Sequence, residues 1–134
     1  MVPASPDPVP GKPIPDAAAR ELKADMLQMA ARFGDPHPTS ITAVTAIHHE
    51  ALRTATPGDF VPGREHEITY LVLMTGNFTS PRGHPPGGRT PTGRYLAVLV
   101  EPSTFRVSDL GLRDNPPPIA LQTYGPVSDL TEQP

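Results

Sequence analysis

The sequence predicts a two-layer α+β domain in which an N-terminal helix packs on a curved antiparallel sheet of about four strands. The first observation is an apolar stripe of helical period over residues 17–33. The second is the segment Arg94–Leu112, which has the pattern of two apolar strands joined by a tight, proline-containing turn. The third is that the predicted strands follow one another through loops, and strands joined in this way pair antiparallel.

Proline marks both flanks of the predicted domain. Six of the first fifteen residues are proline, and three consecutive prolines stand at 116–118. Proline lacks a backbone donor and fixes φ, so such segments favour extended polyproline II structure over helix or sheet. We therefore predict a Pro-rich tail at residues 1–15, a single domain at 16–112 and a Pro-rich C-terminal extension at 113–134.

The predicted helix occupies residues 17–33. Asp16 follows Pro15 and is typical of an N-cap, while Gly34 is typical of the residue that ends a helix. The apolar stripe consists of Leu22, Met26, Met29, Ala30 and Phe33. We interpret this stripe, methionines included, as the face that packs in the core.

Residues 40–48, SITAVTAIH, form the first predicted strand. The segment is rich in β-branched residues and lacks glycine and proline, as strands do. A helix is the alternative, because Ile41, Val44, Ile47 and His48 also fit a period of about 3.6 residues. We predict the strand, followed by a short helical turn and a loop.

The remaining strands are predicted at 67–75, 94–101 and 106–112. The first of these is apolar on both faces, with Leu71 and Leu73 on one side of the sheet. A long loop rich in glycine and proline follows at 77–92. The last two strands are joined by Glu101–Thr104, in which Pro102 takes the second position of a predicted type I turn.

The overall composition limits the possible functions. A net charge of −3, from 11 basic and 14 acidic residues, gives no electrostatic case for a nucleic-acid partner. The absence of cysteine excludes disulfides, thiolate nucleophiles and zinc–thiolate sites. The longest apolar run, Tyr70–Met74, is too short to span a bilayer, so we predict no membrane span.

The first residues carry no basic segment followed by an apolar one, so they do not predict a signal peptide. A Pro-rich start is also compatible with a spacer that remains after an export signal has been removed. If a signal was removed, an extracytoplasmic location is favoured; otherwise the location is cytoplasmic.

The last predicted hairpin consists of an apolar strand, an acidic-Pro-x-Thr turn and a Val-bearing strand, formed by Leu96–Val100, Glu101-Pro102-Ser103-Thr104 and Val107. In this pattern the hairpin resembles that of PepSY-like domains. The Pro-rich flanks and the segment TPTGRYLAVLV are also similar to those of small actinobacterial proteins. The resemblance implies a cystatin-like fold and a binding, inhibitory or regulatory accessory module, often outside the cytoplasm, with no catalytic residue.

The chain departs from the PepSY-like pattern at two positions of this turn. Glu101 stands where these domains usually have Asp, and Phe105 stands where they usually have Gly. Because glycine takes a positive φ easily and phenylalanine resists it, we expect the turn geometry to differ.

His48, Glu50 and His66 are the candidate metal ligands. Only His48 and Glu50 would share a face of one strand, so a third ligand would have to come from elsewhere. We therefore predict no metal site and no cofactor. Glu65 and Glu67 lie on one side of an incoming strand, and they would perform acid–base chemistry only if burial raised the pKa of one of them.

Two surfaces are candidate binding sites. The first is the loop before the third strand, where Arg82, Arg89 and Arg94 would hold an anion or a partner; the loop lacks a G-K-[ST] ending, so it is not a P-loop. The second is the sheet face that carries Leu71 and Leu73, because one helix covers only one face of a sheet. The Pro-rich flanks, a second copy or a partner would have to cover it.

We therefore predict a small non-catalytic binding or regulatory module that acts through the second sheet face or the 80–93 loop. Its partner would be a protein or peptide, or a second copy that associates through the sheet. The alternative is a small enzyme with a pocket between helix and sheet, in which His48, Glu50, Glu65 or His66 would act as acid or base. A metal-dependent module is a third hypothesis, which we do not favour.

Overall fold

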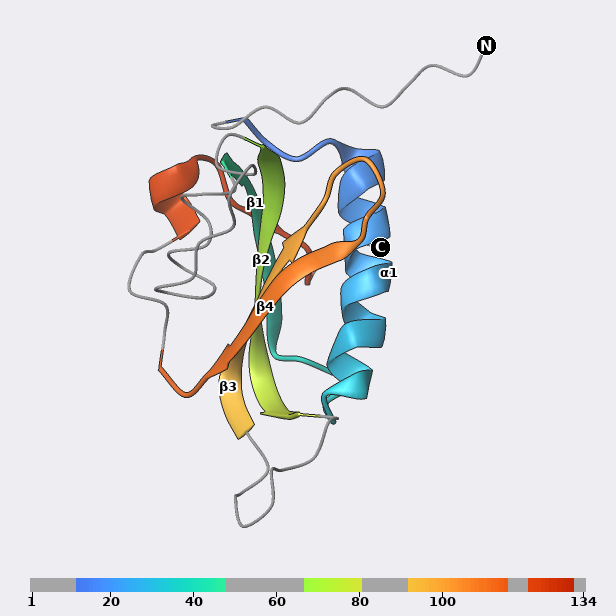
Figure 1. Cartoon of the computed structure of the whole chain (residues 1–134), viewed down its shortest axis with the longest axis vertical. Coiled ribbons are helices and arrows are strands. Elements are labelled where there is room, and N and C mark those ends of the chain that lie inside the picture. The colour runs from blue at the N-terminus through green and yellow to red at the C-terminus, as the bar shows by residue number, and fades with distance from the viewer. Residues whose placement is uncertain (1–11, 48–66, 81–91, 116–120, 132–134) are drawn as a thin grey trace.

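The structure, a computed structural model, describes residues 12–47, 67–80, 92–115 and 121–131. Within these residues, one helix covers one face of an antiparallel sheet (Figure 1). The sheet has five strands in the order β4-β3-β2-β1-β5. The elements are α1 (Asp16–Arg32), β1 (Ser40–Ile47), β2 (Ile68–Thr79), β3 (Thr92–Val100), β4 (Val107–Arg113), the 3-10 helix η1 (Leu121–Tyr124) and β5 (Ser128–Asp129). The predicted α+β class is confirmed.

α1 begins at Asp16, one residue earlier than predicted. Asp16 is therefore not the N-cap. Pro15 holds that position without a side-chain hydrogen bond, and its carbonyl accepts the N–H of Ala19 at 2.9 Å. The carboxylate of Asp16 lies in the first turn, where its negative charge interacts favourably with the positive end of the helix dipole. At the other end Phe33 is the C-cap and Gly34 has a φ of +87°, as predicted for the glycine that ends the helix.

β1 confirms the strand predicted from residue 40 as far as Ile47, and the helical alternative is wrong. β1 pairs with β2 along its whole length, β2 with β3 and β3 with β4, in each case antiparallel. β2 continues past the predicted end at residue 75 to Thr79. A β-bulge between Thr75 and Phe78 interrupts the pairing with β3, which then resumes.

The fifth strand is the element that the sequence analysis missed. β5 has two residues, and it pairs with β1 through Thr42↔Asp129 and Ala43↔Ser128. So short a strand beside Pro126 carries no periodic pattern, and neither alternation nor composition marks it. β5 makes the C-terminal segment part of the sheet, whereas the prediction treated that segment as an extension of the domain.

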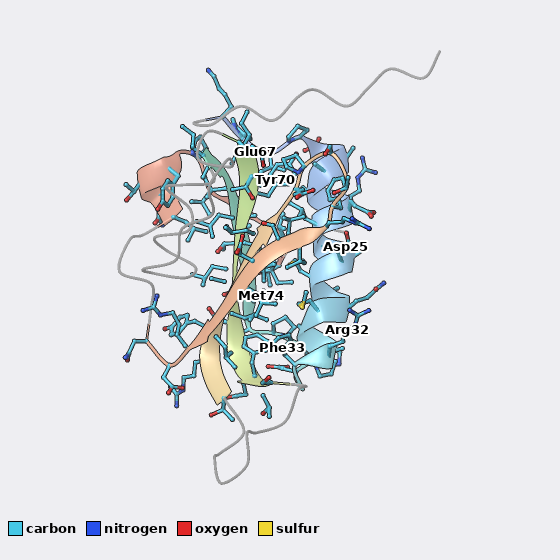
Figure 2. All side chains as sticks on the ribbon, in the orientation of Figure 1. Asp25, Arg32, Phe33, Glu67, Tyr70 and Met74 are labelled. Carbon is cyan, nitrogen blue, oxygen red and sulfur yellow. The ribbon has the colours of Figure 1, made fainter. Side chains whose placement is uncertain are left out.

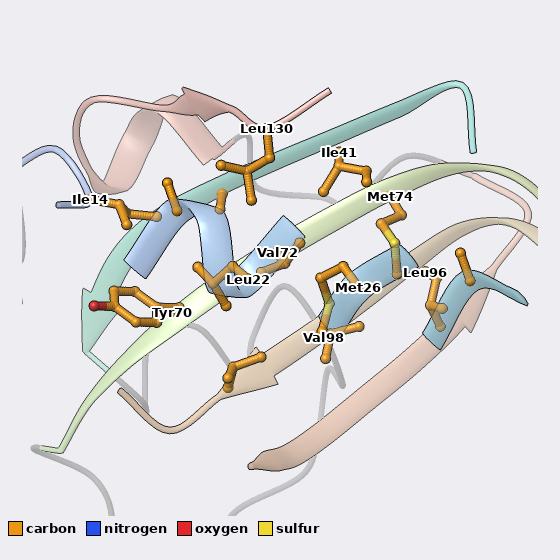
Figure 3. Packing of buried hydrophobic residues seen from close by; sticks show 14 of the residues in the cluster. Ile14, Leu22, Met26, Ile41, Tyr70, Val72, Met74, Leu96, Val98 and Leu130 are labelled. Carbon is orange, nitrogen blue, oxygen red and sulfur yellow. The ribbon is translucent and has the colours of Figure 1, made fainter. Parts of the chain in front are cut away.

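The main hydrophobic core lies between α1 and the sheet (Figure 3). Leu22 and Met26 of α1 are at most 1% exposed, and they share one cluster with Val72 and Val98 of the central strands. The interpretation of the apolar stripe as a core face is confirmed. Leu130, which follows β5, is also completely buried in this helix-side core.

A second, smaller core lies on the opposite face of the sheet, toward which the alternate residues of β1, β2 and β3 point. Its buried members are Val44, Ala46, Leu71, Ala97, Leu99 and Leu121, and Leu73, Tyr124 and Val127 pack against them. Leu121 and Tyr124 belong to η1, which contacts β1. The C-terminal segment therefore covers part of the face that α1 leaves open.

Thr45 and Thr69 are buried threonines of neighbouring strands that differ in hydrogen bonding. The Oγ1 of Thr45 has no hydrogen-bond partner among the described residues, whereas the Oγ1 of Thr69 donates to the carbonyl of Val100 at 3.1 Å. Valine keeps the shape of threonine and removes the hydroxyl. We expect Thr45→Val to raise the free energy of unfolding by about 1 kcal/mol and Thr69→Val to lower it by about 1 kcal/mol. Urea unfolding measures both values, and changes of the same sign would contradict the assignment.

Candidate functional site

The structure describes three of the residues that were predicted to bind a partner. Arg94 is exposed in β3, Leu71 is completely buried in the second core, and Leu73 is half-buried beside it. The side chain of Leu71 is therefore not exposed on this sheet face, and its role in binding stays a prediction. The other predicted site positions lie outside the described residues: His48, Glu50, Glu65, His66, Arg82 and Arg89.

Arg94 lines a shallow depression of about 300 Å³ where β2 and β3 approach the segment that follows β4. The lining residues are Asn77, Phe78, Thr79, Thr92, Gly93, Arg94 and Asp114. The depression thus presents one guanidinium and one carboxylate near a buried aromatic ring. Because it is open to solvent, it suits polar contacts with a bound chain better than chemistry that needs water excluded.

The β-bulge in β2 builds one side of this depression, and Asp35 holds it in place. The Oδ2 of Asp35 accepts the N–H of Asn77 at 2.9 Å, and its Oδ1 accepts the N–H of His37 at 3.0 Å. The N–H of Thr79 donates to the carbonyl of Phe33 at 2.6 Å, which fastens the bulged strand to the end of α1. This role was not predicted from the sequence, although an Asp in a Pro-rich turn is typical of an Asx turn.

β4 forms one edge of the sheet, and this edge is the candidate binding site. No other described strand lies along the outer side of β4, which crosses in front of the other strands in Figure 1. Val107 and Leu110 are 37% and 38% exposed, and they lie opposite Val100 and Val98 of the helix-side core. The pairing of β3 with β4 shifts its register between Leu99 and Val100, so both side chains project from the helix side although they are three residues apart. From Asp109 to Arg113, where the register is regular, every second residue of the edge points its N–H and C=O outward.

The hairpin turn before β4 has a left-handed residue. The N–H of Phe105 donates to the carbonyl of Glu101 at 2.8 Å, one residue later than the bond that closes a β-turn. Phe105 has a φ of +56°, which only glycine adopts without strain. Its ring packs against Tyr70 with 6.2 Å between the ring centroids. This contact stabilises a conformation that we expected phenylalanine to resist.

Tyr70 is 2% exposed between the sheet and α1 (Figure 2), and burial raises the pKa of its phenol above the ordinary 10.0. Since the folded state disfavours the phenolate, stability is unaffected at neutral pH and falls as the pH rises from 10.0 through the raised pKa. As the pH rises above 10.0, we expect the free energy of unfolding to fall less in Tyr70→Phe than in the native chain. Urea unfolding at several alkaline pH values measures this, and parallel losses would contradict it.

Asp25 lies on α1 (Figure 2). It is the other described group with a displaced pKa. Partial burial raises the pKa of its carboxyl, and the neighbouring carboxylate of Glu21 on α1 raises it further. Both side chains are acidic and lie one helical turn apart, so they repel each other when ionised. This pair belongs to the surface of α1 and does not line the depression near Arg94.

The described part of the chain shows neither a metal-binding cluster nor a membrane-spanning helix. Within residues 12–47, 67–80, 92–115 and 121–131, no three His, Asp or Glu side chains come close enough together to hold a metal ion. Over the same ranges, no helix has the length and apolar character needed to cross a membrane.

Comparison with known proteins gives no match: no protein-family model, no curated protein and no solved structure matches this chain. The fold defines the described part of the chain as an α+β domain in which no described strand pairs with the outer side of β4. The resemblance of the last hairpin to PepSY-like domains stays a prediction.

Proposed function

We propose that this chain is a small non-catalytic binding module that takes up an extended polypeptide segment along its open edge strand, β4. The observation that carries the proposal is the edge itself, which combines outward backbone groups with the exposed side chains of Val107 and Leu110. A partner strand would gain its affinity from main-chain hydrogen bonds and its selectivity from side chains that meet these two residues.

The second sheet face supports partner binding less well than the edge does. Leu71 and Leu99 are completely buried there, and Leu121 of η1 packs in the same cluster. A partner on that face would first have to displace the C-terminal segment. The edge of β4 requires no such displacement, because no described strand of the chain occupies it.

The depression near Arg94 extends the proposed site at one end. Asp114, which follows β4, and Arg94 both line it, so a segment that runs along β4 would reach two charged groups at this end. The arrangement supports binding of a peptide with polar groups beyond its paired region. We therefore propose that Arg94, which the sequence predicts to hold an anion or a partner, contributes to a site centred on β4.

Selection from a random linear peptide library on the immobilised chain tests the proposal. We expect selected peptides to slow amide hydrogen exchange in β4 and to bind Leu110→Lys roughly tenfold more weakly. The matched control is Gln122→Lys, which changes an exposed residue of η1 and should leave affinity unchanged. Peptides that protect β1 and η1 in place of β4, or a library that yields no binder, would contradict it.

A further inference from the structure

We infer that the segment taken up by this edge is β4 of a second copy, which pairs antiparallel about a two-fold axis at Gly111. The inference rests on the proposed function, since it names the partner of the same edge. A two-fold axis that relates antiparallel strands is perpendicular to the sheet, so residues of the same face lie opposite each other. The possible symmetric registers therefore differ only in which residue of β4 lies opposite the same residue of the other copy, next to the axis.

The charged residues of β4 distinguish between these registers. Asp109 lies opposite Leu99, and Arg113 lies opposite Tyr95. The side chains of Asp109 and Arg113 therefore point to the face of the sheet away from α1. Each of the two also interacts within its own chain. An axis at Asp109 would oppose two carboxylates, and an axis at Arg113 would oppose two guanidiniums. Gly111 is the midpoint of these two residues. An axis there places Asp109 of each copy opposite Arg113 of the other, which gives two opposite-charge pairs.

The apolar residues of β4 favour the same register. With the axis at Gly111, Leu110 of each copy lies opposite Leu112 of the other on the helix side of the sheet. Leu110 is 38% exposed, and Leu112 is partly buried against the helix-side core. Cross-strand pairs of apolar or oppositely charged side chains stabilise a sheet. An axis at Leu110 would instead place Asp109 opposite Gly111, which carries no charge. The charged residues and the apolar residues of β4 therefore both favour the axis at Gly111.

Sedimentation velocity of the full chain over a wide concentration range tests the inference by charge exchange. We expect a reversible monomer–dimer equilibrium for the native chain. Asp109→Arg and Arg113→Asp should each weaken it by roughly tenfold or more, because each variant opposes like charges twice. An equimolar mixture of the two variants should dimerise again, since one chain is then basic and the other acidic at both positions.

Two lysine substitutions provide a matched pair that does not depend on these charges. Leu110→Lys and Val107→Lys change side chains of nearly equal exposure, 38% and 37%, on the same side of β4. Only Leu110 lies within the residues that pair about Gly111, so only Leu110→Lys should prevent dimerisation. Thermal unfolding of each variant checks that the monomer is folded, and if Arg113→Asp does not fold, the lysine pair decides the result.

The outcomes separate this inference from the proposed function. A native chain that stays monomeric, a variant mixture that does not dimerise, or equal effects of Leu110→Lys and Val107→Lys would overturn the self-pairing. If library peptides still protect β4 in such a chain, the edge binds other polypeptides and the proposed function stands. If neither peptides nor a second copy protect β4, both fail.

Discussion

Replacing Leu130 by alanine is expected to lower the free energy of unfolding by roughly 3 kcal/mol. Leu130 is completely buried in the helix-side core, and its N–H donates to the carbonyl of Ile41 at 2.8 Å. The truncation removes buried methyl groups and leaves a cavity between α1 and β1, where well-packed neighbours relax only in part. A loss of this size is a large fraction of the total stability of a small domain.

Leu110→Ala is the matched control for this prediction, because it removes the same atoms from a side chain that is 38% exposed. We expect it to lower the free energy of unfolding by less than about 1 kcal/mol at concentrations where the chain is monomeric. Urea unfolding followed by circular dichroism measures both variants. If Leu130→Ala costs no more than Leu110→Ala, the C-terminal segment does not belong to the core.

The sequence predicted those parts of the fold in which one physical pattern is repeated over many residues. The stripe from Leu22 to Phe33 recurs with helical period, and the whole face that it defines is buried except for Met29, which is partly exposed. The two-faced apolarity of β2 was also a correct signal, because the sheet has a core on each face. Hydrophobic burial imposes such patterns, so they can be read without the structure.

The parts that the sequence did not predict depend on single contacts between distant segments. β5 is followed by Leu130, whose side chain is buried in the core and whose N–H donates to the carbonyl of Ile41. Neither contact leaves a periodic pattern in the sequence. Asp35 holds a bulge across 42 positions of sequence, from the end of α1 to Asn77. Interactions of this kind are specified by tertiary geometry, and local propensity carries no information about them.

The candidate site was likewise predicted only in those features that follow from a sequence pattern. The last hairpin was predicted from its apolar strands and its turn, and the structure makes its second strand the open edge of the sheet. Which strand lies at an edge depends on the order of strands in space, which the sequence pattern did not determine. The positive φ of Phe105 was likewise not predicted, since the Tyr70 ring that packs against it comes from another strand.

Replacing Gly93 by alanine is expected to lower the free energy of unfolding by about 3 kcal/mol and to loosen the end of β4. A Cβ at this position would lie 2.7 Å from the carbonyl oxygen of Arg113 and 2.9 Å from its carbonyl carbon and its nitrogen. These are backbone atoms, so no side-chain rotation relieves the contact and β4 itself has to move. Urea unfolding measures the stability, and amide exchange in β4 reports the local change.

Gly34→Ala separates this close approach from a general effect of replacing glycine. A Cβ at Gly34 would lie no closer than 3.8 Å to Thr79, so only the φ of +87° opposes the substitution. We expect a loss of about 1 kcal/mol without faster exchange in β4. Since Arg113 belongs to the proposed pairing about Gly111, Gly93→Ala should also weaken self-association, whereas Gly34→Ala should not. Equal stability losses and equal exchange in the two variants would show that Gly93 does not set the distance between β3 and β4.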